Sequence, residues 1–165
     1  MTGTHQNRWM IRRDYEAALA IPNAAIPWTH DDLRTHNENY NNISLIAEDE
    51  DCEVCGWVSY LLGETYYHIA NMAVCPQRQG IGTAIIQSLV DKLGHGHRSI
   101  ITTEVPETAT EALCFFRQCG FLVSDQGKGV ILLRYTLPEV NELFESDGVF
   151  FRRSSGWPLL LPEGF

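Results

Sequence analysis

Residues 73–84 read AVCPQRQGIGTA, and this stretch decides the fold because it joins the end of a strand to the start of a helix. Pro76 ends the strand pattern, and Gly80 and Gly82 allow backbone conformations with positive φ and close approach of a ligand. The first N–H groups of the helix have no partner inside it, and with the positive end of the helix dipole they form an anion site. Arg78 adds a positive charge beside them. The stretch therefore predicts a site for phosphate groups.

Two other classes of phosphate-binding loop do not fit this stretch. A Walker loop needs Gly-Lys-Ser or Gly-Lys-Thr, and the chain has Gly82-Thr83 without the lysine. A dinucleotide-binding fingerprint needs three glycines inside a βαβ unit, and here the third glycine is missing and the preceding strands read as a meander. An ordinary strand-to-helix turn that binds no ligand remains the alternative at this point.

The pattern on both sides of the loop predicts an α+β fold with a mixed, mostly antiparallel sheet flanked by helices. Residues 43–47, 54–62 and 65–74 read as an antiparallel meander. Apolar residues from Ile81 to Leu93 recur at helical spacing, and Gly94 ends that helix. The other expected strands are 9–12, 100–105, 121–124 and 130–137, and the other expected helices are 15–21 with Asp14 as N-cap, 30–36 behind a capping box at Thr29, and 108–119 ending at Gly120.

The loop resembles the acetyl-CoA-binding loop of the GNAT superfamily of acetyltransferases, whose pattern is Q/R-x-x-G-x-G/A. Residues 77–82 satisfy this pattern, and so does a second register, 79–84; we prefer the first because it leaves the helix in its usual phase. The resemblance extends from about residue 10 to residue 137 and is closest to the ribosomal-protein-alanine N-acetyltransferases. The segments that carry it are AIPWT (25–29), NMAV (71–74), EV (104–105) and FFRQCGF (115–121).

This resemblance implies the GNAT fold and an enzyme that moves an acetyl group from acetyl-CoA to a primary amine without a metal. In the family, the strand backbone at Met72, Ala73 and Val74 pairs with the pantetheine arm, and one N–H there polarises the thioester carbonyl. By carry-over, Glu104 is the catalytic base, and its place at the end of an apolar strand leads us to expect a partly desolvated carboxylate. The acceptor-binding residues implied are Trp28, His68 and Asn71. The cofactor-binding loop residues implied are Gln77, Arg78, Gln79, Gly80, Ile81, Gly82 and Thr83.

Three departures from the family bear on the mechanism and the acceptor. In the family, the general acid is a tyrosine in the helix expected here at 108–119, and that position is Phe116 in this chain. Either the thiolate leaves unassisted, or another group such as Tyr66 or Tyr67 serves, with a cysteine as a further alternative. The family's asparagine near the start of that helix is replaced by Ala109. The hairpin at 125–129 is much shorter than the family segment that lines the peptide channel.

Length and charge restrict the class of protein further. The 165 residues fit one domain, and 44% hydrophobic residues are ordinary for a globular protein. A net charge of −9, with only 12 Lys and Arg scattered along the chain, argues against nucleic-acid binding. No apolar run approaches the ~18 residues of a membrane helix, and residues 1–9 carry no signal-peptide pattern. We therefore expect a cytoplasmic protein with no membrane partner.

The five cysteines are expected to be reduced, because their number is odd. Cys52 and Cys55 form a CxxC pair, but no second pair completes a zinc set, so we expect buried or half-buried thiols instead of a metal or redox site.

The acetyltransferase domain is expected to span residues 9–137, followed by a C-terminal extension at 138–165. The extension is apolar at Phe150-Phe151, Trp157 and 159–161, so we expect it to pack on the domain or on a partner chain, which leaves a homodimer open.

The leading hypothesis is an N-acetyltransferase that acts on a protein N-terminal α-amine. A small-molecule amine acetyltransferase is the second reading. A non-catalytic acyl-CoA-binding module that has lost the acid and the asparagine is the third.

Overall fold

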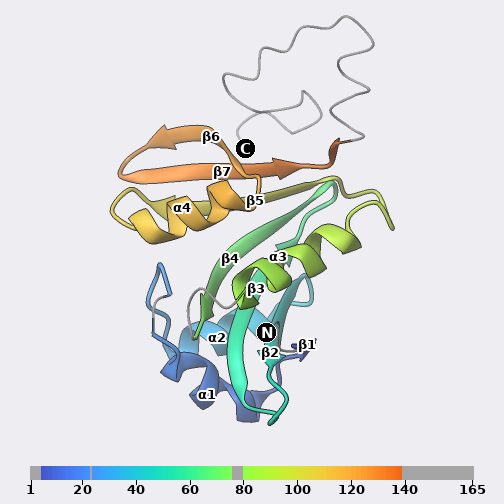
Figure 1. The fold of residues 1–165 in the computed structure, drawn as a ribbon, viewed down its shortest axis with the longest axis vertical. Coiled ribbons are helices and arrows are strands. Elements are labelled where there is room, and N and C mark those ends of the chain that lie inside the picture. Colours follow the sequence, from blue (N-terminus) through green and yellow to red (C-terminus); the bar gives the residue numbers. More distant parts are fainter. Residues whose placement is uncertain (1–4, 23, 76–79, 139–165) are drawn as a thin grey trace, which may run out of the picture. The chain divides into compact units, whose positions relative to one another are not determined.

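Figure 1 shows the computed structural model of the chain, which describes residues 5–22, 24–75 and 80–138. The extension expected at 138–165 lies outside the described residues except for Pro138. In chain order the elements are β1 (Gln6–Trp9), a 3-10 helix (Arg12–Asp14), α1 (Tyr15–Ala20), α2 (His30–Glu38), β2 (Asn42–Glu48), β3 (Val54–Leu62), β4 (Tyr66–Val74), α3 (Ile81–Lys92), β5 (Ile100–Pro106), α4 (Thr110–Gln118), β6 (Leu122–Gly127) and β7 (Val130–Thr136).

The strands of the described residues form a seven-stranded sheet in the order β1-β2-β3-β4-β5-β7-β6. The β1–β2, β2–β3, β5–β7 and β6–β7 pairs are antiparallel. The expected α+β class and order of elements are confirmed. The chain divides into two compact units: the first runs to Gly63 and includes His68–Leu89, and the second comprises Glu64–Tyr67 and the chain from Val90 onward.

The core of the first unit lies between its strands and the helices α1 and α2. Leu33 of α2 and Ala18 of α1 are fully buried against Ile46, Trp57 and Ala73 of the strands. The capping box predicted at Thr29 is confirmed: the hydroxyl of Thr29 accepts from Asp32 N at 3.3 Å, and the carboxylate of Asp32 accepts from Thr29 N at 2.7 Å. This cap satisfies donors of the first turn of α2 and fixes where the helix begins.

A chain of polar contacts connects α1 and α2 to the sheet. Asn37 Nδ2 donates to Tyr15 Oη at 2.9 Å, and Ser44 Oγ donates to Asn37 Oδ1 at 2.6 Å. The hydroxyls of Ser44 and Ser59, both buried, lie 2.7 Å apart and share a hydrogen bond. Each of these polar groups is therefore satisfied inside the fold, as burial requires.

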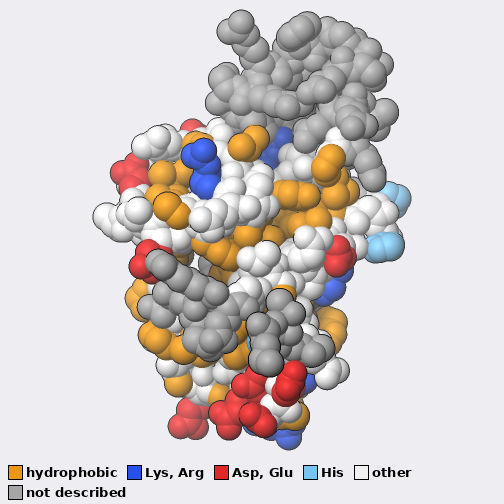
Figure 2. All heavy atoms as spheres, viewed as in Figure 1, with side chains coloured by type: hydrophobic (Ala, Val, Ile, Leu, Met, Phe, Trp, Pro, Cys, Tyr) orange, Lys and Arg blue, Asp and Glu red, His pale blue; other side chains and the backbone are white. Residues whose placement is uncertain are grey.

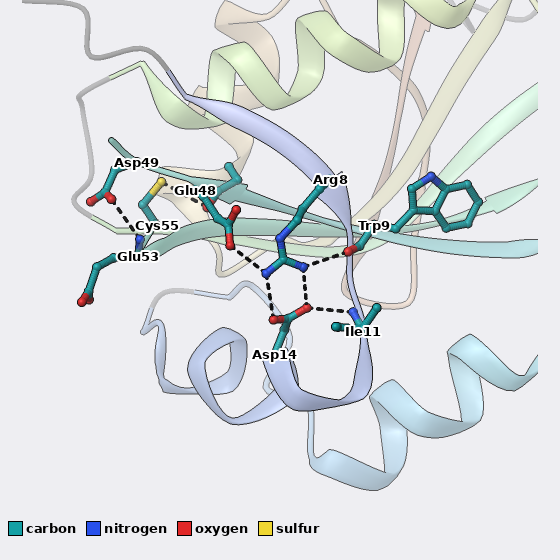
Figure 3. A network of polar contacts seen from close by, with 9 residues as sticks. Arg8, Trp9, Ile11, Asp14, Glu48, Asp49, Glu53 and Cys55 are labelled. Atoms are coloured by element: carbon teal, nitrogen blue, oxygen red, sulfur yellow. Dashed lines mark hydrogen bonds and ion pairs between the residues drawn. The ribbon is translucent and has the colours of Figure 1, made fainter. Parts of the chain in front are cut away.

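Arg8 connects β1 to the helical segment that follows it (Figure 3). Its guanidinium donates to both carboxylate oxygens of Asp14, at 2.8 and 2.9 Å, and to Glu48 of β2 at 2.7 Å. Asp14 is buried and also accepts from Ile11 N at 2.8 Å. Asp14 occupies the N-cap position of α1, as predicted, but its side chain bonds to Arg8 and Ile11 and makes no capping hydrogen bond to that helix.

The turn between β2 and β3 is a cluster of carboxylates. Five of the six residues at 48–53 are acidic, and Figure 2 shows acidic side chains gathered at the lower end of the view, where this turn lies in Figure 1. Asp49 Oδ1 accepts from Asp51 N and Glu53 N, both at 3.0 Å. One of these carboxylates therefore closes the turn itself.

The second unit is built on β5, β6, β7 and α4. Phe116 of α4 packs edge-on against Phe121, with ring centroids 5.1 Å apart, and Phe121 lies against Tyr135 of β7 at 5.8 Å. Phe121 is fully buried. Gly120 has φ +93, and a Cβ there would meet the ring of Tyr135 at 3.4 Å, so this position both ends α4 and allows the ring to pack closely.

The first strand and the last hairpin differ most from the sequence prediction. The first strand ends at Trp9, and the expected strand residue Arg12 belongs to the 3-10 helix. The loop expected at 125–129 is a two-residue turn, because Gly127 pairs with Val130 and only Lys128 (φ +56) and Gly129 (φ +77) lie between them. Positive φ at both central residues is typical of a type I′ hairpin.

All five cysteines lie within the described residues, where none forms a disulfide, and their burial is not uniform. Cys55 is buried and its Sγ lies 3.2 Å from the carbonyl oxygen of Ala47. Cys52, Cys75 and Cys114 are exposed, so the expectation that the thiols are buried or half-buried is wrong for these three.

Replacing Arg8 by methionine should lower the free energy of unfolding by about 1–3 kcal/mol at neutral pH, because Asp14 and Glu48 lose charged donors. The hydrogen bonds from Arg8 hold the pKa of Asp14 below its usual value, against the opposing effect of burial. A carboxylate with a lowered folded-state pKa stabilises the fold above its unfolded pKa and loses this contribution as the pH falls through the folded pKa. The deficit of Arg8→Met should therefore shrink below about pH 4, as urea unfolding curves would measure.

The control is Arg34→Met, which removes an exposed pair with Asp31 at 3.0 Å. We expect it to change the free energy of unfolding by less than about 0.5 kcal/mol. An Arg8→Met deficit that stayed constant from neutral pH to about pH 3 would contradict the role given to Asp14.

Candidate functional site

The start of α3, directly after β4, has the geometry of an anion site. Gly80 has φ +81, a region that L side chains rarely adopt, and among the described residues nothing lies within 4 Å of where its Cβ would be. The bond from Ala84 N to Gly80 O, at 2.9 Å, closes the first turn. The N–H groups of Ile81, Gly82 and Thr83 precede that bond and have no acceptor within the helix, so they are suited to an anion.

Of the predicted loop, Gly80 and Thr83 are exposed while Ile81 and Gly82 are buried. The predicted cofactor residues Gln77, Arg78 and Gln79 lie outside the described residues. The exposure of Gly80 and Thr83 on either side of the buried Ile81 and Gly82 fits a diphosphate, which would be held by backbone donors.

Gly56 of β3 brings the first turn of α3 close to the sheet. A Cβ at Gly56 would lie 3.1 Å from Ile81 Cγ2, 3.1 Å from Ile85 Cδ1 and 3.2 Å from Val74 Cγ1. These distances are tighter than an ordinary carbon–carbon contact. Any larger residue would push the turn away from β3 and β4. Sequence reasoning missed this residue, although a glycine inside a strand does signal close approach of another element.

The end of β4 offers its backbone amides on one side. Cys75 N donates to Cys55 O of β3 at 2.8 Å. Because successive N–H groups of a strand point to opposite sides, those of Val74 and Met72 point away from β3. The Met72 N–H donates to Asn71 Oδ1 at 3.0 Å. Val74, at the C-terminal end of β4, therefore directs its N–H away from β3, as a donor to a bound chain at this end of the strand would.

Asn71 lies in β4 with both ends of its amide engaged by backbone groups. It is buried, and its Nδ2 donates to Ile26 O at 2.7 Å, across 45 residues of sequence. Ile26 belongs to the connection between α1 and α2, where the predicted acceptor residue Trp28 also lies. Asn71 was predicted to bind the acceptor, and the structure uses its amide to hold this connection on β4.

Trp28 and His68 are both half-buried. The ring of Trp28 lies 5.4 Å from that of His36 and 5.8 Å from that of Trp57, so much of it packs on the core of the first unit. Desolvation lowers the pKa of His36. His68 lies in β4, three residues before Asn71.

Glu104 lies in β5, a strand that is otherwise almost wholly buried, opposite Leu132 of β7. Its side chain is exposed, so the expected partial desolvation is wrong. An exposed carboxylate can still accept a proton from an amine that approaches it.

The structure assigns Phe116 to the core of the second unit, where it is 4% exposed. No proton donor is available at this position. Of the two alternative acids, Tyr66 is half-buried, and Tyr67 is buried with Arg98 above its ring at 5.5 Å. Ala109 precedes α4 and has no side-chain cap.

Within residues 5–22, 24–75 and 80–138, no group of three or more His, Cys, Asp or Glu is arranged to hold a metal ion. None of the helices that the structure describes is long and apolar enough to cross a membrane.

Comparison with known families agrees with this geometry. The sequence profile of the acetyltransferase (GNAT) domain matches residues 41–123, just over half of the 165 residues. The chain therefore belongs to the GNAT acetyltransferases, a family of acetyl-CoA-dependent N-acetyltransferases. A search of curated protein sequences finds no match.

Solved structures of this family share the fold at low sequence identity. The ribosomal-protein-S18-alanine N-acetyltransferase from Escherichia coli is 20% identical, with a TM-score of 0.69, over 81% of this chain and 94% of that one. The PaiA N-acetyltransferase from Thermoplasma acidophilum, in complex with coenzyme A, is 12% identical, with a TM-score of 0.69, over 81% and 99%. The spermidine/spermine N-acetyltransferase SpeG from Vibrio cholerae is 15% identical, with a TM-score of 0.62, over 84% and 99%.

Replacing Gly80 by alanine should weaken acetyl-CoA binding about tenfold, because an L residue held in the left-handed region costs about 1–2 kcal/mol. Since no atom of the described part of the chain lies within 4 Å of a Cβ there, we assign the loss to the backbone conformation. Isothermal titration calorimetry on the full chain would measure it.

Gly96→Ala is the matched control, because Gly96 also has nothing within 4 Å of its Cβ position but has no left-handed φ. Equal affinities for wild type, Gly80→Ala and Gly96→Ala would show that the conformation of Gly80 does not matter for binding.

Proposed function

We propose that the chain transfers the acetyl group of acetyl-CoA to the α-amine of a protein N-terminus. The observation that carries the proposal is the start of α3: a left-handed Gly80, then backbone N–H groups outside the helical bonding, directly after the strand β4. In this proposal the diphosphate of acetyl-CoA binds at Gly80 to Thr83, and the pantetheine arm runs along β4 at Met72 to Val74.

The chain's own residues would then act on the thioester in a single displacement. The Val74 N–H donates to the thioester carbonyl and stabilises the oxyanion that develops when the amine attacks, without reorganising. Glu104 accepts the proton of the attacking nitrogen as the C–N bond forms. The C–S bond breaks and CoA leaves as a thiolate, which takes a proton from solvent or from Tyr66 or Tyr67, since Phe116 has none to give.

The chemistry of the acceptor favours an α-amine over a lysine side chain. An α-amine has a pKa near 8, so roughly a tenth of it is neutral at pH 7. A lysine amine, with a pKa near 10.4, is neutral in only about one molecule in two thousand. An exposed carboxylate such as Glu104 is a modest base, and it is sufficient when much of the nucleophile is already neutral.

A small-molecule amine is the second candidate, and one observation favours it. The β6–β7 connection is reduced to Lys128 and Gly129, so this hairpin supplies little surface to line a peptide channel. A third candidate, a non-catalytic acyl-CoA-binding module, draws support from the burial of Phe116 where the family has its acid.

One experiment separates the three candidates. The full chain is incubated with acetyl-CoA and either peptides with free N-termini, including N-terminal alanine, or small amines that include spermidine. Acetylated product is then measured by mass spectrometry. Peptide turnover supports the first candidate, and turnover of small amines alone replaces it with the second. Tight CoA binding without turnover in either panel leaves the third.

Replacing Glu104 by glutamine should lower turnover about 10²-fold, at the lower end of the usual range for a general base because the carboxylate is exposed. The affinity for CoA should remain within about twofold, since Glu104 is not assigned to cofactor binding. Steady-state kinetics and calorimetry would measure the two quantities.

Glu107→Gln is the control for the same chemical change. Glu107 is exposed just after β5, and its Oε1 accepts from Gln126 Nε2 at 3.1 Å. If both variants kept the turnover of the wild type, Glu104 would have no role as the base.

A further inference from the structure

We propose that Asn71 is a positioning residue for the acceptor: it fixes the Ile26–Pro27 corner against β4 and so sets how the amine approaches the thioester. The inference rests on the proposed function, because it takes β4 as the strand that carries the acetyl group.

The two contacts of Asn71 determine the orientation of its amide. Ile26 O can only accept a hydrogen bond and Met72 N can only donate one. If the amide were flipped, Oδ1 would face Ile26 O and Nδ2 would face the Met72 N–H, and neither hydrogen bond could form. Asn71 is 5% exposed, so neither contact is readily replaced by water. Aspartate at this position would keep the oxygen that accepts from Met72 N but would set an oxygen against Ile26 O.

The Ile26 contact lies between two apolar anchors. Ala24 and Trp28, on either side of Ile26, pack against the core of the first unit. Ile26 is 37% exposed, and Pro27 is also exposed. The connection is therefore attached by its flanks to the core and by its middle to β4, and the residues at the middle present apolar surface to solvent.

The Met72 contact decides which backbone donor β4 offers. Met72 and Val74 direct their N–H groups to the same side of the strand, away from β3. Asn71 Oδ1 accepts from Met72 N at 3.0 Å, which leaves Val74 to serve the thioester carbonyl. The amide of Asn71 thus engages the Met72 N–H, which leaves Val74 as the donor to the thioester. The same amide holds the Ile26–Pro27 corner on β4, at the residue that precedes Met72. Ile26, which is bonded to Asn71 of this strand, and Pro27 are both exposed, so the substrate class that fits this corner carries an apolar group next to the amine.

The test compares Asn71→Asp with Asn37→Asp in the full chain. Asn37 is a matched control because it is an asparagine, half-buried where Asn71 is buried, whose Nδ2 likewise donates, at 2.9 Å, and whose Oδ1 likewise accepts, at 2.6 Å. Three quantities are measured: the Kd for acetyl-CoA, the KM and kcat for the best acceptor of the panel above, and hydrogen exchange of residues 24–29.

We expect Asn71→Asp to raise the acceptor KM about tenfold or more, since small misplacement of a reacting group can cost about 10² in rate. The Kd for acetyl-CoA should stay within about twofold, and exchange at 24–29 should rise. Asn37→Asp should lower stability by a similar amount but leave KM, Kd and the exchange of 24–29 unchanged.

An unchanged KM with increased exchange at 24–29 would overturn the proposal, because the connection would then be loosened without effect on the acceptor. Equal effects of both variants on KM would also overturn it, since a general loss of stability would explain them. Wild-type protein that bound acetyl-CoA but acetylated neither panel would instead contradict the proposed function, and the positioning role would fail with it.

Discussion

The close approach of α3 to β3 at Gly56 is the constraint on which the candidate site depends. With no side chain at this position, Ile81, Ile85 and Val74 fill the space that a Cβ would need. The first turn of α3 is thereby fixed to the same point of the sheet at which β4 ends. A strand edge for an extended arm and a helix start for a diphosphate are rigid relative to one another because both pack on one glycine.

Other contacts within the first unit anchor β4 and fix the positions of the helices. Ala73 of β4 is buried in the same cluster as Trp57, Leu33 and Ala18, so the strand that offers its backbone is anchored by its own side chains. Arg8 joins β1 to the segment before α1, and the polar chain through Asn37 joins α2 to β2. Polar contacts therefore fix where the helices lie, while apolar burial supplies most of the stability.

The fold could be predicted from the sequence where local patterns decide it. The loop at Gly80, the capping box at Thr29 and the helix end at Gly94, where φ is +81, each follow from residues close in sequence. The first strand was misplaced because its residues, Gln6 to Trp9, lack an apolar alternation and owe their pairing to β2. The β6–β7 hairpin was misread as a five-residue loop because glycine and polar residues continue into β6 beyond the turn itself.

The candidate site was less accessible to prediction because its contacts are long-range. Asn71 was marked by the resemblance, but its partner Ile26 lies 45 residues earlier, and nothing local indicates the pairing. The exposure of Glu104 depends on where the cover over its face of β5 ends, since Ile100 and Thr102 on the same face are buried, and alternation alone does not determine this. Gly56 carries a local signal, but the elements that approach it could be named only from the three-dimensional packing.

The thiols of this chain have a practical consequence for anyone who follows the reaction. Acetyl transfer liberates a sulfhydryl, and colorimetric reagents for sulfhydryls would also react with Cys52, Cys75 and Cys114, which are all exposed. Cys75 directly follows the strand proposed to hold the pantetheine arm, so a bulky label there would occupy space next to the arm. Background colour and inhibition would then come from a single side reaction, which makes detection of the acetylated product the cleaner readout.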